Sequence, residues 1–199
     1  FTEVNGRLKN VRFKPIPGKK VKFTLEIPAV NFFHLQTDSG KVNSVSGLGI
    51  AAGIEYFMRK NFFLSVNAGT TLDLFSARHD TINEMEYFHD FCFGPNETSS
   101  AKYLNFRVNK ISPRWEYGAG LTLTNLKWQS NKRTELTDST YFYSPVSYKS
   151  LNIGLSTVVR FRITPNLNVG IQYQPSFYDF QHKSYNYQHL ITTGIVWRF

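Results

Sequence analysis

The stretch HLITTGIVWRF, residues 189–199, alternates between two kinds of side chain. Counting back from Phe199, every second residue is apolar or aromatic except Thr193 and His189. The residues between are more varied and include Arg198 and Gly194. A period of two is typical of a β-strand with two unlike faces. We expect lipid rather than water to contact the aromatic face.

The composition excludes two other classes of protein. No run approaches the roughly 18 uncharged apolar residues of a spanning helix, and mean hydropathy is −0.31. Hydrophobic residues make up 41% of the chain in regular patterns, which is too much for a disordered protein. A membrane β-barrel fits both observations, because only one face of each strand must be apolar. The chain has one cysteine, Cys92, and begins at Phe1, so we expect no internal disulfide and a targeting segment that has been removed.

Short polar breaks recur along the chain at residues 59–61, 112–114 and 164–166. Longer polar stretches alternate with them, at residues 37–41, 78–101, 129–147 and 179–184. Short turns that alternate with long loops are typical of up-and-down hairpins in outer-membrane barrels. The segments between the breaks predict eight strands, at about residues 20–36, 42–58, 62–77, 102–111, 115–128, 148–161, 167–178 and 187–199.

Each predicted strand has one apolar face and one face of charged, amide and glycine residues. An eight-stranded barrel has a lumen just wide enough to be filled by side chains. Buried charges require partners, so we expect carboxylates and guanidinium groups to pair inside the lumen. The predicted pairs join the acids Glu26, Glu55, Asp73 and Glu116 to the bases Arg107, Arg160 and Arg198.

The fold class that follows is all-β: an eight-stranded antiparallel up-and-down transmembrane β-barrel with a lumen filled by side chains. A free edge in lipid would leave backbone groups unsatisfied at several kcal/mol each, so the last strand must pair with the first. We expect two parts, a periplasmic segment at residues 1–19 and a barrel domain at residues 20–199. A soluble lipid-binding barrel is the structural alternative, but it would carry polar residues on its outer face.

The terminal pattern of Ile195, Trp197 and Phe199 resembles the C-terminal signal of small eight-stranded bacterial outer-membrane barrels. That resemblance implies recognition by the barrel assembly machinery and contact with outer-membrane lipids and lipopolysaccharide. The abundance of Tyr, Phe and Asn resembles barrels of Bacteroidota that have no assigned activity. Two triplets, residues 80–82 and 138–140, resemble the O-glycosylation motif of that phylum, which implies Thr81 and Ser139 as acceptors.

The net charge of +9 is concentrated at the predicted periplasmic end, in residues 1–22 and around the short breaks. Basic residues beside a bilayer attract anionic headgroups, which predicts membrane anchoring. Alternatively, residues 1–19 dock a periplasmic or membrane protein, or plug the barrel mouth. No recognition motif accompanies the charges, so nucleic acid is not an expected partner.

Two sets of residues are candidate sites of chemistry. The spacing of His182 and Ser184 resembles the His and Ser pair of outer-membrane lipid A deacylases. No acidic residue follows Ser184 to orient the imidazole, and strand parity places both residues on the lumen side. A second set, His79, Asp80, Glu84, Glu86, His89, Asp90 and Cys92, lacks the spacing of a known metal site. We therefore expect no metal and no cofactor.

Three functions remain open from the sequence. The leading hypothesis is a non-enzymatic outer-membrane protein of a Gram-negative bacterium, with a structural or surface-interaction role. The second is an accessory subunit of an outer-membrane envelope or secretion complex. The third is a lipid A-modifying hydrolase. Exposed aromatics such as the run at residues 141–143 favour contact with a partner or with the membrane interface.

Overall fold

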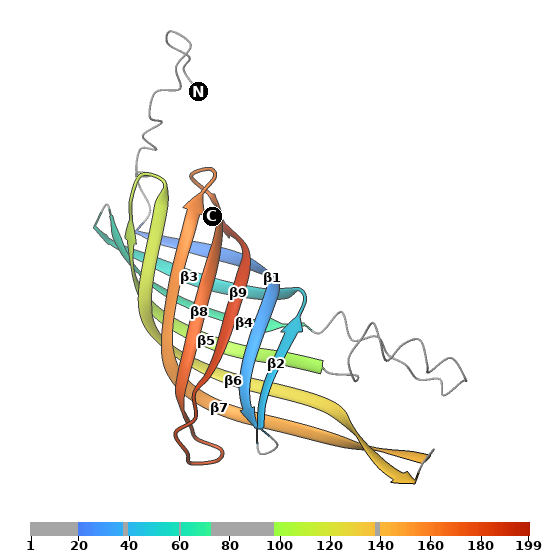
Figure 1. Cartoon of the computed structure of the whole chain (residues 1–199). Helices are drawn as coiled ribbons and strands as arrows, with labels where there is room; N and C mark the ends of the chain where they lie inside the picture. Colours follow the sequence, from blue (N-terminus) through green and yellow to red (C-terminus); the bar gives the residue numbers. More distant parts are fainter. Residues whose placement is uncertain (1–19, 38–39, 60, 73–97, 138–139) are drawn as a thin grey trace.

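The computed structural model describes residues 20–37, 40–59, 61–72, 98–137 and 140–199. These residues form antiparallel strands in a continuous sheet (Figure 1). The strands are β1 (Val21–Thr37), β2 (Gly40–Ser46), β3 (Gly49–Arg59), β4 (Phe62–Thr71), β5 (Thr98–Ile111), β6 (Trp115–Thr137), β7 (Thr140–Arg162), β8 (Leu167–Asp179) and β9 (Gln188–Arg198). Among the described residues, no helix is long and apolar enough to cross a bilayer.

The sheet closes into a ring of eight strand positions. β1 pairs with β9 from Thr24↔Arg198 to His34↔His189, which joins the first strand to the last. β2 and β3 lie end to end along the other edge of β1, β2 from Asn31 to Thr37 and β3 from Val21 to Glu26. They therefore occupy one position in the ring. The predicted eight-stranded antiparallel barrel is confirmed.

The predicted short breaks coincide with the connections from β3 to β4, β5 to β6 and β7 to β8. These connections and the end of β9 lie together, at the top of Figure 1, and we call this the turn end. The opposite end carries the β1–β2, β6–β7 and β8–β9 hairpins, and we call it the hairpin end. The predicted strand at residues 62–77 ends earlier, at Thr71, and the predicted strand at residues 102–111 begins earlier, at Thr98.

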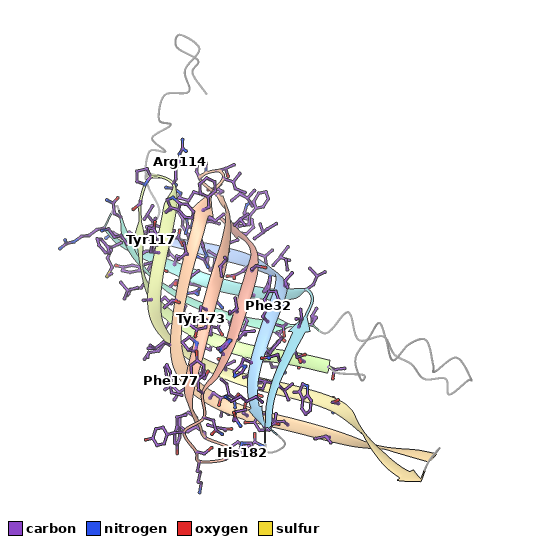
Figure 2. The ribbon with its side chains drawn as sticks, in the orientation of Figure 1. Phe32, Arg114, Tyr117, Tyr173, Phe177 and His182 are labelled. Atoms are coloured by element: carbon purple, nitrogen blue, oxygen red, sulfur yellow. The ribbon has the colours of Figure 1, made fainter. Side chains whose placement is uncertain are left out.

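The two faces of the wall differ in the way that the alternation predicts. Along β6, Trp115, Tyr117, Leu121 and Leu123 face outward and are exposed, whereas Thr122 faces inward and is buried. The same pattern continues around the ring, as the side chains drawn in Figure 2 show. Soluble proteins bury their large apolar side chains and expose their charges. This barrel does the reverse, so its outer surface requires hydrocarbon as its solvent.

Aromatic side chains border the apolar surface at both ends. At the turn end, Trp115 packs edge-on against Phe161, with the ring centroids 5.1 Å apart. Nearer the hairpin end, Phe177 and Tyr187 have ring centroids 6.1 Å apart. In Figure 2, Tyr117 and Phe177 mark these two levels on the outer surface. Aromatic girdles at both interfaces are typical of transmembrane barrels.

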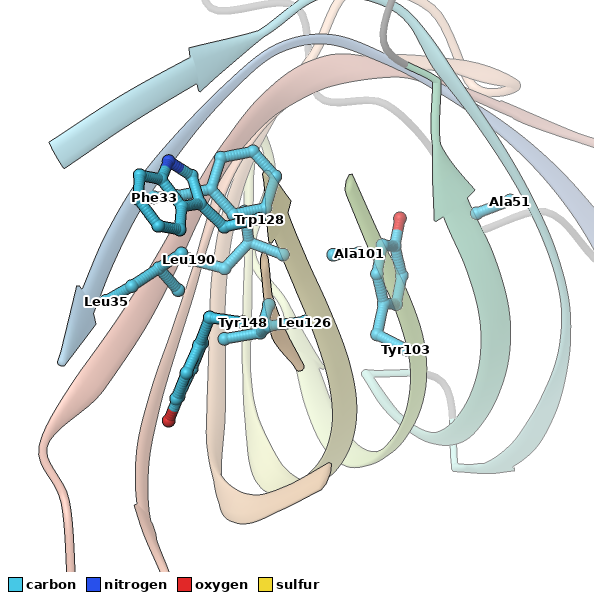
Figure 3. Close-up of a cluster of buried hydrophobic side chains, with 9 residues drawn as sticks. All are labelled: Phe33, Leu35, Ala51, Ala101, Tyr103, Leu126, Trp128, Tyr148 and Leu190. Carbon is cyan, nitrogen blue, oxygen red and sulfur yellow. The ribbon is translucent and has the colours of Figure 1, made fainter. Parts of the chain in front are cut away.

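A β-bulge in β1 changes which side chains enter the lumen near the hairpin end. The register shifts between Pro28 and Val30, so that Phe33 and Leu35 point inward and are buried. They join a cluster of apolar residues inside the wall (Figure 3). Its members are Phe33, Leu35, Ala51, Ala101, Tyr103, Leu126, Trp128, Tyr148 and Leu190. The extra residue of the bulge reverses the parity of every position after it.

Close approach between neighbouring strands requires glycine at some positions of the wall. A Cβ built on Gly120 of β6 would overlap the carbonyl oxygen of Phe106 on β5 and would lie 2.8 Å from the Cα of Arg107. Backbone atoms cannot move aside as the end of a flexible side chain can. Gly120 therefore allows β5 and β6 to approach this closely.

We predict that Gly120→Val lowers the yield of folded barrel, because the new side chain forces β5 away from β6. Overpacking generally destabilises a protein by about 1–3 kcal/mol. We expect a loss near the upper end of this range at Gly120, because the new side chain overlaps backbone atoms. The measurement is the folded fraction in detergent micelles, by the gel mobility of unheated and heated samples. Ala119→Val is the control, since it adds similar bulk at the neighbouring outward-facing position. Equal folding of the two variants would contradict this account of Gly120.

Candidate functional site

Five charged side chains meet inside the barrel near the turn end. Arg160 on β7 donates from Nη1 to Glu116 Oε1 at 2.8 Å and from Nη2 to Glu26 Oε2 at 3.2 Å. Arg198 on β9 donates from Nε to Glu55 Oε2 at 2.5 Å and from Nη2 to Glu116 Oε2 at 2.8 Å. The cluster thus links β1, β3, β6, β7 and β9 across the lumen.

All five side chains are buried, with Glu116 at 0% and Arg198 at 1% relative exposure. Ionised groups leave water at a cost of several kcal/mol each, and they remain stable only with close partners. Here each carboxylate contacts at least one guanidinium group, and both Glu55 and Glu116 contact the two of them. These ion pairs join five strands across the lumen, and the five side chains fill the lumen at this level.

Arg107 departs from the expected pairing. Its guanidinium donates to amide oxygens, from Nη1 to Gln172 Oε1 at 2.5 Å and from Nη2 to Asn67 Oδ1 at 2.9 Å. None of the carboxylates in the described part lies within ion-pairing distance of it. Arg160 and Arg198 occupy the carboxylates at the turn end, and Arg107 is paired with neutral residues instead. Asp73, the remaining member of the predicted network, lies outside the described residues.

Amide and hydroxyl groups form a second network toward the hairpin end. Gln188 donates from Nε2 to the Tyr148 hydroxyl at 2.7 Å, and its Oε1 accepts from Ser150 Oγ at 3.1 Å. The Tyr148 hydroxyl donates to Asp179 Oδ2 at 3.2 Å. This network and the apolar cluster of Figure 3 fill the lumen beyond the ion pairs. A lumen filled with side chains, as predicted from the sequence, is confirmed.

His182 and Ser184 lie in the turn between β8 and β9, at the hairpin end (Figure 2). Asp179 supplies a carboxylate to the imidazole, with 2.6 Å between Asp179 Oδ2 and His182 Nδ1. This partner precedes the histidine in the chain, whereas the sequence-based prediction expected an orienting carboxylate beyond Ser184. Ser184 Oγ accepts a hydrogen bond from Asn186 Nδ2 at 3.0 Å, and no hydrogen bond joins it to His182 in this described turn. The Asp–His pair instead closes the turn, because Asp179 Oδ1 also accepts from the backbone N–H of Gln181 at 2.8 Å.

The terminal residues Ile195, Trp197 and Phe199 all point outward at the seam between β9 and β1. The Phe199 N–H donates to the Phe23 carbonyl oxygen at 2.9 Å, which fixes the end of the chain against β1. With Leu25 and Ile27, the three side chains line an apolar groove of about 300 Å³. A hydrocarbon environment is required on this side of the seam.

Several predicted site residues lie outside the described residues. They are Thr81, Ser139 and the loop residues weighed as metal ligands, His79, Asp80, Glu84, Glu86, His89, Asp90 and Cys92. Within the residues that the structure describes, no group of three or more His, Cys, Asp or Glu side chains is placed to hold a metal ion.

The β6–β7 hairpin extends far beyond the rest of the wall (Figure 1). Its register continues to Thr137↔Thr140. β5 pairs with β6 only as far as Gln129, and β8 pairs with β7 only as far as Asn152. Beyond these residues, no described strand pairs with either outer edge of the hairpin. The polar stretch at residues 129–147 predicts a loop, and that prediction was wrong for residues 129–137 and 140–147, which are β-strand. The segment forms a two-stranded ribbon whose outer edges have no partner among the described strands.

Comparison with solved structures identifies small outer-membrane barrels as similar in shape. The crystal structure of Ail, the attachment invasion locus protein of Yersinia pestis, in complex with the heparin analogue sucrose octasulfate has a TM-score of 0.51 and 12% sequence identity. The alignment covers 91% of this chain and 100% of Ail. This likeness supports the fold, because the whole of Ail is matched.

Two further structures have lower scores. Neisserial surface protein A has a TM-score of 0.47 and 11% identity, over 90% of this chain and 96% of that protein. The N-terminal β-barrel domain of OprF from Pseudomonas aeruginosa has a TM-score of 0.40 and 11% identity, over 88% of this chain and 97% of that domain. No protein-family model matches this chain, and no curated protein matches its sequence.

We predict that Glu116→Gln destabilises the barrel, since it removes the carboxylate shared by Arg160 and Arg198. Breaking one partner out of a buried ion pair costs about 3–5 kcal/mol. The measurement is the free energy of unfolding in urea, in detergent micelles. Lys110→Gln is the control, because it also removes one charge but at an exposed outward position. If Glu116→Gln lowered the free energy of unfolding no more than Lys110→Gln does, the buried ion pairs would not stabilise the barrel as described.

Proposed function

We propose that this chain is an integral outer-membrane protein of a Gram-negative bacterium whose projecting β6–β7 hairpin binds a partner at the cell surface, without catalysing a reaction. The observation that carries the proposal is the hairpin itself, because beyond Gln129 and Leu151 none of the described strands pairs with its outer edges. An unpaired strand edge presents a row of N–H and C=O groups to any segment that can add a strand.

The apolar exterior supports the outer-membrane location. In barrels of this kind, the short turns face the periplasm and the longer hairpins face the exterior. The turn end would therefore lie in the periplasm, where exposed Arg59 and Arg114 are placed beside anionic headgroups. The β6–β7 hairpin would project from the cell. The outward Ile195, Trp197 and Phe199 remain the proposed signal for the barrel assembly machinery.

The geometry of the β8–β9 turn favours a binding role over the hydrolase alternative. Nucleophilic catalysis by serine needs a base within hydrogen-bonding reach of its hydroxyl. The Ser184 hydroxyl is bonded to Asn186, and the His182 imidazole is bonded to Asp179. A structural role in stabilising the β8–β9 turn is therefore sufficient to explain why His182 and Ser184 lie so close together in the sequence.

The accessory-subunit alternative depends on residues 1–19, which lie outside the described residues. At the turn end of the described barrel, Lys22 and Arg162 are buried alongside the Arg160–Arg198 cluster and give it a small excess of positive charge over its three carboxylates. The segment carries Arg7, Lys9, Arg12, Lys14 and Lys19. Like charges disfavour insertion of such a segment as a plug. An acidic periplasmic partner would complement the basic residues of this segment better.

The predicted orientation can be measured by labelling single cysteines in a Cys92→Ser background. Thr140→Cys, at the start of β7 in the projecting hairpin, should react with a membrane-impermeant maleimide on intact cells. A cysteine at Asn166, in the β7–β8 turn, should react only after the outer membrane is permeabilised. The opposite pattern would contradict the orientation, and labelling of both sites on intact cells would contradict membrane insertion.

Binding through the hairpin can be tested by shortening it. Replacement of residues 131–145 by Asn-Gly joins Ser130 to Val146, which already face each other across the ribbon. We expect the barrel to fold normally, because Asn-Gly favours a tight hairpin, and to lose its surface partner. The measurement is crosslinking in intact cells from a photoreactive residue at Thr134, with Gln181 in the β8–β9 turn as the control position.

A discrete adduct from Thr134, absent from Gln181 and competed by purified full-length barrel but not by the shortened barrel, would support the proposal. Equal adducts from both positions, or competition by the shortened barrel, would contradict it.

A further inference from the structure

Three lysines project from the outer surface at neighbouring positions on three consecutive strands. They are Lys102 on β5, Lys127 on β6 and Lys149 on β7, and all are exposed. Lys127 lies directly opposite Lys149 in the ladder. Lys102 lies opposite Asn125, two residues from Lys127, and is therefore its diagonal neighbour.

This arrangement is unfavourable for the protein alone. Side chains directly opposite each other in an antiparallel pair have Cβ atoms about 4.5–5.5 Å apart, and like charges there are destabilising. No carboxylate compensates them within the side chains that the structure describes. The carboxylates found there, those of Glu26, Glu55, Glu116 and Asp179, are all buried. Within the described part of the chain, the three ammonium groups therefore have no counter-ion, and an external anion would relieve their repulsion.

The position of the lysines relative to the bilayer indicates where that anion comes from. On each of the three strands, the next apolar outward positions toward the turn end face hydrocarbon, with Leu104 on β5, Leu123 on β6 and Leu151 on β7. The lysines lie one or two outward steps beyond these residues. That level corresponds to the headgroups at the hairpin end of the membrane, where phosphate groups are found.

We propose that Lys102, Lys127 and Lys149 bind the phosphorylated headgroup of a glycolipid that carries more than one phosphate, as lipid A does. Strands lie about 4.8 Å apart, so three adjacent strands span about 10 Å. This width exceeds a single phosphate and suits two phosphates joined by a sugar unit. Outward Ser100 lies opposite Lys127 and outward Asn125 lies opposite Lys102, and they offer a hydroxyl and an amide donor to the sugar.

The site is confined to one side of the barrel. On β8, β9 and β1, the outward positions at the hairpin end carry Tyr173, Phe177, His189 and His34 instead. A lipid bound on the β5–β7 side would therefore sit at the base of the projecting hairpin. The proposal rests on the outer-membrane location proposed above, and it is independent of what the hairpin binds.

The test compares the wild type with the triple variant Lys102→Gln/Lys127→Gln/Lys149→Gln. Each protein is placed in phosphatidylcholine nanodiscs that contain diphosphoryl lipid A, monophosphoryl lipid A or phosphatidylglycerol. Native mass spectrometry then counts the lipids retained per barrel. A lysine near an anionic surface contributes about a fivefold gain in affinity, so we expect the triple variant to bind diphosphoryl lipid A about 100-fold more weakly.

Lys41→Gln is the matched control, because Lys41 is exposed at the hairpin end of β2, on another part of the ring. It should retain diphosphoryl lipid A as the wild type does, and inorganic phosphate at millimolar concentration should not displace the lipid. Equal retention by the triple variant would overturn the proposal. So would an equal preference for phosphatidylglycerol, which would show only a general attraction to anionic lipid.

A single substitution gives a second readout that does not depend on lipid retention. Lys127→Gln relieves the repulsion from Lys149, so it should raise the thermal midpoint in pure phosphatidylcholine. With diphosphoryl lipid A present, the same substitution should lower the midpoint, because a phosphate loses a partner. The same direction of shift in both lipids would overturn the proposal, whether or not the hairpin binds a partner.

Discussion

The hydrogen bonds between β1 and β9 are the constraint on which the rest of the structure depends. In hydrocarbon, no water is present to satisfy a strand edge, so a sheet that spans a membrane must close. The ladder from Thr24↔Arg198 to His34↔His189 satisfies that requirement, and the Phe199 N–H extends it to the last residue of the chain. Closure joins the first strand to the last across the bilayer, and among the described strands the longest unpaired edges lie on the part of the β6–β7 hairpin that projects beyond it.

Closure with eight strands also explains the unusual interior. The ring is too narrow for a channel and is filled by its own side chains. The charges within it therefore have to be paired, and Arg160 and Arg198 share Glu26, Glu55 and Glu116 across five strands. The narrow ring also brings β5 and β6 close together at Gly120, and its lumen is filled by the apolar cluster around Leu126 and Trp128. The interior thus stabilises the barrel, and the proposed interactions fall on its outer surface and hairpins.

The sequence predicts the wall of this barrel well because strand periodicity is a local property. Alternation in the final strand is enough to place Trp197 outside and Arg198 inside. It is not enough to identify partners across the lumen, since these depend on the stagger between strands. For that reason Glu116 and Arg160 were correctly assigned to the lumen, whereas Arg107 was expected to contact a carboxylate and instead contacts Gln172.

Departures from regular alternation explain the remaining differences. The bulge between Pro28 and Val30 carries no clear signal in the residue types, yet it turns Phe33 inward. The segment beyond Gln129 is rich in polar residues and lacks a regular alternation of apolar and polar residues, so the sequence predicts a loop there. Asp179 was missed as the partner of His182 because it precedes the histidine in a tight turn. In each case, tertiary context overrides a local pattern.

The most direct test of the account asks whether hydrocarbon contacts the apolar face of the wall. Trp115 points outward and Trp128 is buried in the lumen, so variants that retain one of them, with the other two tryptophans replaced by Phe, report on the two sides. In bilayers of brominated phosphatidylcholine, the fluorescence of Trp115 should be strongly quenched and that of Trp128 should be nearly unchanged. Quenching of Trp128 but not Trp115, or a barrel that stays folded in water without lipid or detergent, would contradict the central claim.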